Sequence, residues 1–127
     1  LHLVHPLGFQ LDNAALKRAG MDYWKQLSVV EHRSFNALLE DCAGEPLDYC
    51  STKASRPYWD IRFRPGDYLV FGRETKGLPE GLLEKNPDNA ITIPMPNAAA
   101  RTLNLATAAG IVLYEALRQQ QAEGSAE

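Results

Sequence analysis

The sequence predicts an α/β domain whose sheet is mainly parallel and flanked by helices, on three observations. Short apolar segments typical of strands alternate along the chain with segments of helical periodicity. Glycine or proline stands at most of the boundaries between these segments. The chain has 127 residues, of which 45% are hydrophobic and 23% charged, and this is the size and composition of one globular domain. We therefore expect a single domain over residues 1–127.

Three strands and two helices are expected in the first part of the chain. The first strand alternates apolar residues with histidine and stops at Pro6, and the other two are short apolar runs. Asp12 and Ser34 are suitable N-cap residues for the two helices, and a glycine ends each of them. In order, the expected elements are a strand at Leu1–His5, a helix from Asp12 to Gly20, a strand at Leu27–Val30, a helix from Ser34 to Gly44 and a strand at Leu47–Ser51.

The middle of the chain is expected to contain a long loop, a strand and a short helix. Residues 53–66 have no clean period and include prolines, so we expect a loop with one turn of helix. The uninterrupted apolar run at Asp67–Phe71 is typical of a strand buried on both faces. Pro79 suits the first position of a short helix, which Asn86 and Pro87 stop.

The last part of the chain is expected to form a strand and one long helix. Ile91–Ile93 is a β-branched run bounded by prolines, which predicts a strand. The helix should run from Thr102 to Gln121 and leave a frayed tail from Gly124. Further apolar residues surround its main apolar face, so we expect burial on more than one side. That face comprises Leu105, Ala108, Ala109, Val112 and Ala116.

The composition argues against several classes of protein. No apolar run approaches the roughly 20 residues of a membrane span, and the first residues lack the pattern of a signal peptide. The two cysteines, Cys42 and Cys50, and the three histidines do not have metal-ligand spacing, so we expect no metal. So few cysteines favour a reducing compartment, and we expect a cytoplasmic protein.

Positive charge is concentrated in one segment although the net charge is −3. Between Lys53 and Lys76 there are six basic side chains against three acidic ones, with Tyr58, Trp59 and Phe63 among them. Such a segment could bind phosphates and stack on bases. Alternatively, it is a solvated loop whose aromatic residues cap the core.

Two loops carry the residues with chemical content. Residues 71–79 and residues 93–102 each leave a predicted strand and enter a predicted helix. In an open α/β sheet, ligands bind beyond the carboxyl ends of the strands, so both loops should border one crevice. Gly72 and Gly77 allow close approach of a ligand to the backbone, although they could serve only turn geometry. Asn104 could be only a helix cap that competes with Thr102.

These loops and the helix after them contain an ordered set of motifs: Phe71-Gly72-x-Glu74-x-x-Gly77-Leu78-Pro79, Ile93-Pro94-Met95, Arg101-Thr102-Leu103-Asn104-Leu105-Ala106 and Tyr114-Glu115-Ala116. Together they are similar to the second and third motifs of the SpoU branch of the SPOUT RNA methyltransferases. Near the start of the chain stand Pro6-Leu7-Gly8-Phe9 and the run from Leu16 to Tyr23. These segments resemble, more narrowly, the small tRNA (cytidine/uridine-2′-O-)-methyltransferases that act on the wobble nucleotide, and the similarity covers nearly the whole chain.

The resemblance implies an α/β-knot fold, with the C-terminal third threaded through a deep trefoil knot. It also implies methyl transfer from S-adenosylmethionine to a tRNA ribose without a metal, on a homodimer. Leu78 and Met95 would add apolar wall to the cofactor pocket. The polar candidates for catalysis are Arg101, Asn104 and Tyr114. The expected cofactor contacts are Cys50, Gly72, Ile93, Thr102 and Leu105, unless these residues only pack the knot.

Two departures from the family pattern bear on activity. The first family motif, which normally precedes the strand that Leu1–His5 resembles, is absent, together with one strand and one helix. Thr102 and Ala106 replace two usual serines. We therefore expect this chain to hold the cofactor and to transfer methyl groups poorly. A catalytically silent cofactor- or RNA-binding module and an unrelated nucleotide-binding α/β protein are the alternatives.

Overall fold

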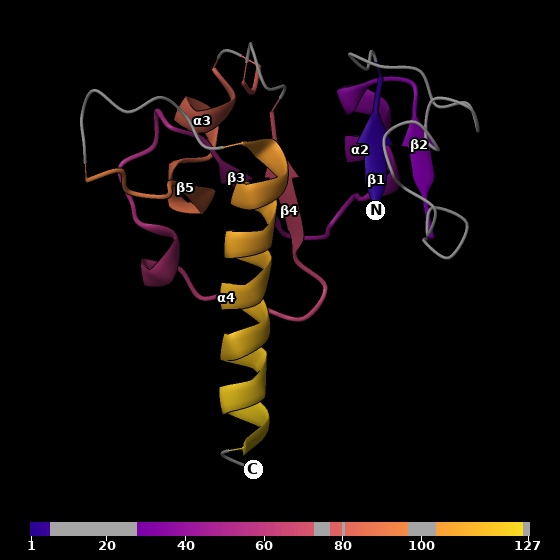
Figure 1. Cartoon of the computed structure of the whole chain (residues 1–127). Helices are drawn as coiled ribbons and strands as arrows, with labels where there is room; N and C mark the ends of the chain where they lie inside the picture. Colours follow the sequence, from indigo (N-terminus) through magenta and orange to yellow (C-terminus); the bar gives the residue numbers. More distant parts are fainter. Residues whose placement is uncertain (6–27, 73–76, 80, 97–103, 126–127) are drawn as a thin grey trace, which may run out of the picture. The chain divides into compact units, whose positions relative to one another are not determined.

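A computed structural model describes most of the chain, which divides into two compact units, Leu1–Gly44 and Glu45–Glu127 (Figure 1). The expected helix from Asp12 to Gly20 lies outside the described residues, as do Arg101 and Thr102. The structure describes residues 1–5, 28–72, 77–79, 81–96 and 104–125.

The first unit contains two parallel strands and a short helix. Strand β1 (His2–Val4) pairs with β2 (Val30–His32), with Leu3 opposite Glu31. Helix α2 (Phe35–Asp41) begins where the sequence predicts, because the Ser34 hydroxyl accepts a hydrogen bond of 3.1 Å from the Ala37 N–H.

The second strand lies further along the chain than predicted. We expected Leu27–Val30, but β2 runs from Val30 to His32 and ends in a buried histidine. The prediction followed the apolar run, whereas the strand includes His32, because the buried ring has polar partners inside the unit. Its Nδ1 lies 3.2 Å from the Asp41 carboxylate and its Nε2 lies 2.9 Å from Nδ1 of His2. A buried histidine is tolerated when both ring nitrogens are bound in this way.

The second unit is built on a three-stranded parallel sheet in the order β4-β3-β5. The strands are β3 (Leu47–Cys50), β4 (Tyr68–Phe71) and β5 (Ala90–Ile91). The register sets Cys50 opposite Phe71 on one side and Ile91 on the other. Because all three strands are parallel, their carboxyl ends lie at the same edge of the sheet.

The two-sided burial predicted for Asp67–Phe71 is wrong. All four residues of β4 are only half-buried, whereas the middle strand β3 contains the buried Asp48 and Tyr49. An apolar run records hydrophobicity and not the number of neighbouring strands. Because Asp48 is polar, the sequence does not indicate that β3 is the more deeply buried strand.

Short helical turns connect the strands. Residues 53–66 form the expected loop with one turn, η2 (Tyr58–Asp60). Helix α3 (Leu82–Lys85) starts later than predicted from Pro79, because Gly81 has a left-handed backbone with φ of +81° that is incompatible with a helix. A further turn, η3 (Pro87–Asn89), leads into β5, which is shorter than the predicted Ile91–Ile93 strand.

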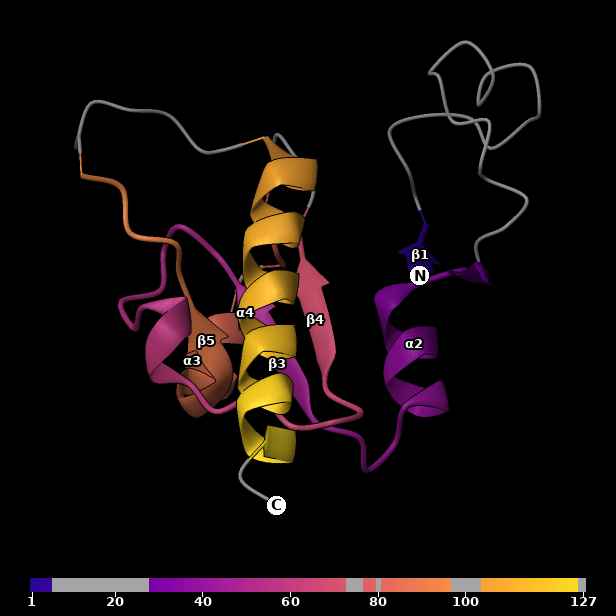
Figure 2. The ribbon, with the colours of Figure 1, turned by 60° about the horizontal axis from the view of Figure 1, so that its bottom comes forward.

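The long helix α4 (Leu105–Ser125) covers one face of this sheet (Figure 2). Its buried residues Val112 and Ala116 form the core cluster with Phe63 and Ile91. Phe63, Ile91 and Val112 are almost completely inaccessible to solvent. The predicted apolar face of the helix is therefore confirmed at its centre.

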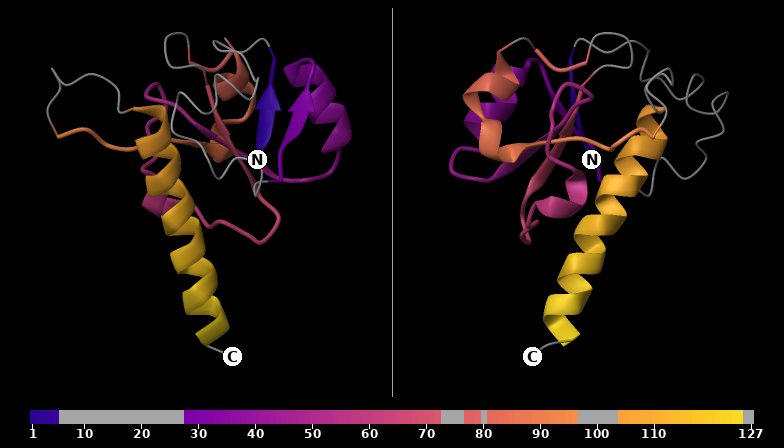
Figure 3. Two further views of the ribbon diagram at one scale, coloured as in Figure 1. Left: turned by 45° about the vertical axis from the view of Figure 1, so that its right-hand side comes forward. Right: turned by 90° about the vertical axis from the view of Figure 1, so that its left-hand side faces the viewer.

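Two predictions about α4 are wrong. The helix is buried on one side only, and its opposite side exposes Leu113, Tyr114 and Leu117. It also continues through the predicted tail to Ser125, and an ion pair of 3.0 Å between Glu123 and Arg62 anchors its last turns. The C-terminal half of α4 extends beyond the sheet of its unit (Figure 3).

Candidate functional site

The carboxyl edge of the β4-β3-β5 sheet brings together three of the five predicted cofactor residues. Cys50 ends β3, Gly72 follows β4, and Ile93 lies two residues beyond β5. The Ser51 N–H donates to the Ile91 carbonyl over 2.9 Å, which extends the pairing past Cys50. Cys50 and Ile93 are half-buried and pack against the core cluster.

The segment after β5 is held by backbone hydrogen bonds to the 53–66 loop. The Thr92 N–H donates to the Arg56 carbonyl over 2.8 Å, and the Tyr58 N–H donates to the Thr92 carbonyl over 2.9 Å. These bonds form a short parallel bridge between Pro57 and Thr92. Ile93 therefore follows a backbone position that is held by hydrogen bonds.

Gly72 is required by the protein's own backbone. A Cβ atom at this position would overlap the carbonyl group of Gly77 and the amide nitrogen of Leu78. The chain therefore returns directly against the end of β4, and only glycine permits the approach. The sequence predicts a ligand or turn geometry as the reason for this glycine, and the structure supplies a third reason, the close approach of the chain itself. Leu78 and Met95, the other predicted wall residues, are half-buried.

Cys50 supplies a neutral surface at this edge. Burial raises the pKa of its thiol to about 11, because desolvation disfavours the thiolate. A thiol that stays protonated at neutral pH is a weak nucleophile and behaves as a small apolar side chain. The edge therefore offers apolar wall and backbone groups, which suit an aromatic ring system in a bound cofactor.

Asn104 and Tyr114, the two catalytic candidates that the structure describes, do not come together within one chain. The Asn104 Oδ1 accepts hydrogen bonds from the N–H groups of Ala106 and Thr107 at 2.9 and 3.4 Å, so the side chain caps α4. Tyr114 is 72% exposed, ten residues further along the same helix. Ten residues of α-helix correspond to roughly 15 Å along the axis. Leu105, the remaining described cofactor residue, is half-buried at the first position of α4.

The residues of the basic segment differ in their exposure to solvent and in the groups that they contact. Phe63 is buried in the core and Tyr58 packs against that core, as the solvated-loop interpretation expects, but Trp59 is 53% exposed. Arg62 pairs with Glu123, whereas the Arg56 guanidinium donates to the uncharged Asp88 carbonyl over 3.0 Å and has no acidic partner among the described residues. The sequence does not distinguish these residues, because periodicity does not assign faces in a loop.

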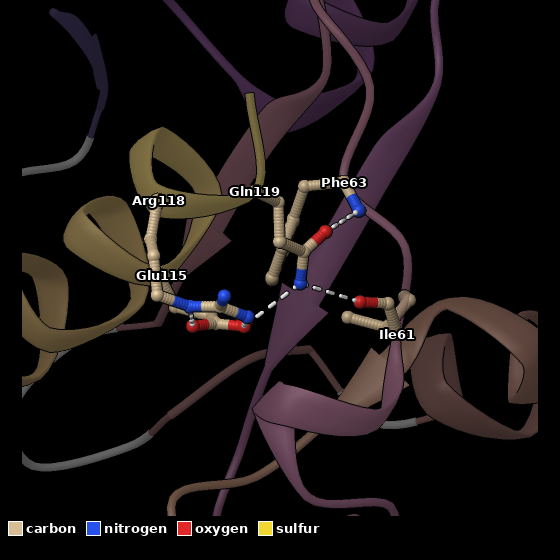
Figure 4. Close-up of polar contacts among 5 residues, drawn as sticks. All are labelled: Ile61, Phe63, Glu115, Arg118 and Gln119. Carbon is tan, nitrogen blue, oxygen red and sulfur yellow. Dashed lines mark hydrogen bonds and ion pairs between the residues drawn. The ribbon is translucent and has the colours of Figure 1, made fainter. Parts of the chain in front are cut away.

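A side chain of α4 holds the end of this loop (Figure 4). The Gln119 Oε1 accepts from the Phe63 N–H over 2.8 Å, and its Nε2 donates to the Ile61 carbonyl over 3.0 Å. The same Nε2 donates to Glu115, which also binds Arg118. Gln119 thus gives the loop the donor and acceptor that a neighbouring strand would provide.

A second polar cluster lies at the opposite end of the sheet. Asp48 is 3% exposed, and the Asn89 Nδ2 donates to the Leu47 carbonyl and to Asp48 at 3.0 and 3.4 Å. Burial, and then the neighbouring Asp67 carboxyl, raise the pKa of Asp48 to about 8. Asp48 Oδ2 and Asp67 Oδ1 are buried, and the described residues give them no N–H partner, so one proton shared between the carboxyls accounts for both.

Two features are absent from the described residues. Within residues 1–5, 28–72, 77–79, 81–96 and 104–125, no group of three or more histidine, cysteine or acidic side chains is arranged to hold a metal ion. None of the helices in this part of the chain has the length and hydropathy needed to cross a membrane.

Comparisons with known proteins give a consistent result. The family model described as SpoU rRNA Methylase family matches residues 1–114. A Saccharophagus degradans protein named tRNA (cytidine(34)-2′-O)-methyltransferase is 46% identical over 127 residues, covering 98% of this chain and 81% of that protein.

Two solved structures extend this likeness to the fold. One, described as giving structural insights into the 2-OH methylation of C/U34 on tRNA, is 44% identical with a TM-score of 0.86, and the match covers 95% of this chain and 78% of the other. The second, an AdoMet-bound rRNA methyltransferase from Sinorhizobium meliloti, is 27% identical with a TM-score of 0.70, over 92% of this chain and 44% of the other.

Proposed function

We propose, from the premise that this chain belongs to the SpoU methylase family, that it methylates the ribose 2′-hydroxyl of a wobble cytidine or uridine in tRNA, with S-adenosylmethionine as donor. One structural observation carries the assignment of the site. Cys50, Gly72 and Ile93, chosen from sequence as cofactor contacts, end or follow three adjacent parallel strands at one edge. Ligands of open α/β sheets bind at that edge.

The residues at this edge fit the cofactor. Half-buried Cys50, Leu78, Ile93 and Met95 provide apolar surface for an adenine ring, and the loop backbones provide hydrogen-bonding groups. The neutral Cys50 thiol adds no charge to this wall. The cofactor supplies a methyl group already activated on a sulfonium, so the protein has to align the acceptor and remove its proton.

Arg101, Asn104 and Tyr114 remain the candidates for ribose positioning and proton removal. Within one chain, Asn104 caps the helix and Tyr114 lies roughly 15 Å further along it. A site that uses both residues would need two copies of the chain. The proposal therefore links Tyr114 to a homodimer.

The homodimer is supported by the exposed side of α4. Leu113 and Leu117 are 46% and 45% exposed, and Tyr114 lies between them in the sequence. Spacings of three and four residues place side chains on one helix face. An apolar face of this kind on a helix that extends beyond its sheet is typical of an interface between subunits.

We also propose a knot in the C-terminal third, a single domain over residues 1–127 and a cytoplasmic location. Family membership supports the knot and the single domain. tRNA modification in a reducing compartment accords with two free cysteines, of which Cys42 is buried and Cys50 is half-buried.

Methyl transfer to tRNA tests the proposal directly. The chain is incubated with labelled S-adenosylmethionine and unmodified tRNA, and the product is digested to locate the methyl group on the 2′-oxygen of nucleotide 34. A tRNA carrying 2′-deoxyribose at that nucleotide is the matched control and should accept no label. Binding of S-adenosylhomocysteine is measured in parallel by calorimetry. Cofactor binding without any transfer would favour the catalytically silent module, and no binding by the folded chain would refute the assignment of the site.

A further inference from the structure

We propose that Trp59 and Arg56 form an RNA-contacting surface beside the cofactor edge, in which Trp59 stacks on an unpaired base and Arg56 binds a phosphate. The inference rests on the proposed function, because it takes the RNA substrate from there. It assigns to a specific pair of residues a contact that neither the family match nor the site geometry identifies.

The exposure of Trp59 is the first observation. Of the three aromatic residues in the 53–66 loop, Phe63 is 1% exposed and Tyr58 packs against the core, yet the larger indole of Trp59 is 53% exposed. Apolar area that stays exposed to water contributes no hydrophobic stabilisation to the fold. Stacking on a base would remove that area from solvent, and unpaired bases are the groups that RNA-binding proteins stack on aromatic side chains.

The turn that carries Trp59 is fixed before any ligand arrives. Tyr58 donates to the Thr92 carbonyl, and the Asp60 N–H donates to the Pro57 carbonyl over 3.0 Å. The Tyr58 ring meets the Trp59 ring edge-on, with centroids 5.1 Å apart. A fixed aromatic platform loses little conformational entropy on binding, which favours affinity.

Charge favours a phosphate beside Arg56. Its guanidinium contacts the Asp88 carbonyl, which carries no net charge, so its positive charge is not neutralised by that contact. Arg62 in the same loop instead pairs with Glu123 at 3.0 Å. The nearest acidic side chain in sequence is Asp60, which is exposed and follows Trp59. Asp60 should weaken RNA binding slightly, because its charge repels phosphate.

The position of this pair suits the same RNA that reaches the cofactor. The Arg56 carbonyl and the Tyr58 N–H bind the two sides of Thr92, and Ile93 is the next residue. The surface is therefore connected by backbone hydrogen bonds to the loop that borders the site. A nucleotide flanking the methylated one is the proposed occupant.

The test measures tRNA affinity as a function of salt. Trp59→Ala should weaken binding about 10-fold, and Trp59→Phe should restore most of it, because stacking depends on an aromatic face. Arg56→Ala should lower the slope of log affinity against log salt by about 1. Arg62→Ala is the matched control and should leave that slope unchanged, and Asp60→Asn should strengthen binding. S-adenosylhomocysteine affinity should stay constant in all five variants.

A spectroscopic readout follows the indole itself. Trp24 and Trp59 are the two tryptophans of the chain, so a Trp24→Phe background leaves Trp59 as the single emitter. Its fluorescence should be quenched by an anticodon stem-loop. Unchanged affinity in Trp59→Ala, absence of quenching, or loss of dimer in Trp59→Ala would each overturn the inference. If wild type binds no tRNA at all, the proposed function fails as well, whereas normal methylation by a fully binding Trp59→Ala variant rejects the inference alone.

Discussion

The two ends of the β4-β3-β5 sheet have opposite chemistry. At the amino ends of the strands, Asp48 is buried beside Asp67 and contacts Asn89. At the carboxyl ends, half-buried Cys50 and Ile93 provide an apolar wall. The same three strands thus hold a titratable pair at one end and a neutral surface at the other.

The group with the most strongly raised carboxyl pKa therefore lies at the end of the sheet opposite the proposed cofactor site. Strongly shifted pKa values are a common guide to active sites, and here they point to Asp48. The cofactor site that we propose lies at the other end, where the ionisable group is the protonated Cys50 thiol. Burial of Asp48 acts on the stability of the fold.

The largest effect expected from this comparison is a pH dependence of stability. The pKa of Asp48 is raised in the folded chain from an ordinary 3.8 to about 8. Its contribution is therefore full below pH 4 and is lost as the pH rises toward 8, because folding must then take up a proton. The free energy of unfolding should fall as the pH rises across that window. Urea unfolding at a series of pH values measures it.

Asp48→Asn separates this effect from general titration. The amide is neutral at every pH and can donate to Asp67, so the variant should lose the slope and exceed wild-type stability at pH 8. Asp60→Asn, at an exposed position, is the matched control and should keep the slope. A wild-type profile that is flat between pH 4 and 8 would contradict the shared proton.

At the opposite end, Gly72→Val should cost about 2 kcal/mol of stability and abolish S-adenosylhomocysteine binding. The added side chain would overlap the backbone of Gly77 and Leu78 and displace the loop. Gly110→Ala is a matched control, since a Cβ there meets nothing within 4 Å and alanine favours the helix. Thermal unfolding and calorimetric titration measure the two effects, and a Gly72→Val protein with normal binding would show that the loop tolerates the displacement.

The smallest change is expected for Cys50→Val. If the thiol is only apolar wall, valine should change S-adenosylhomocysteine affinity by less than about threefold, a difference under 1 kcal/mol. Wild-type Cys50 should also react slowly with iodoacetamide at pH 8, because its pKa of about 11 leaves little thiolate. A tenfold loss of affinity in the valine variant would mean that the sulfur makes a specific contact.

The sequence predicted the elements whose signals are local. Ser34 identified the start of α2 through its capping hydroxyl, and the apolar face of α4 identified Val112 and Ala116 as core. Alternation of strands and helices was sufficient for the parallel sheet, and therefore for the convergence of Cys50 and Ile93 at one edge.

What could not be predicted depends on neighbours that are distant in sequence. The burial of Asp48 follows from its place in the middle strand, beside Asp67 and Asn89. The opposite fates of Trp59 and Phe63 follow from the course of a loop that has no period. Helix propensity likewise does not predict that one side of α4 stays exposed, because the exposure of a helix side depends on which segments pack against it.

The strand order has a consequence for how the second unit folds. The central strand β3 precedes both of its partners in the chain, and its two pairings join Cys50 to Phe71 and then to Ile91. Neither edge of β3 can pair through a local hairpin. The backbone groups beside buried Asp48 therefore form their hydrogen bonds only after later segments have been synthesised. Closing such long-range parallel contacts is slow and leaves unpaired edges open to other chains. During synthesis the unit should therefore stay vulnerable to aggregation until β5 has been made and α4 follows to cover the sheet.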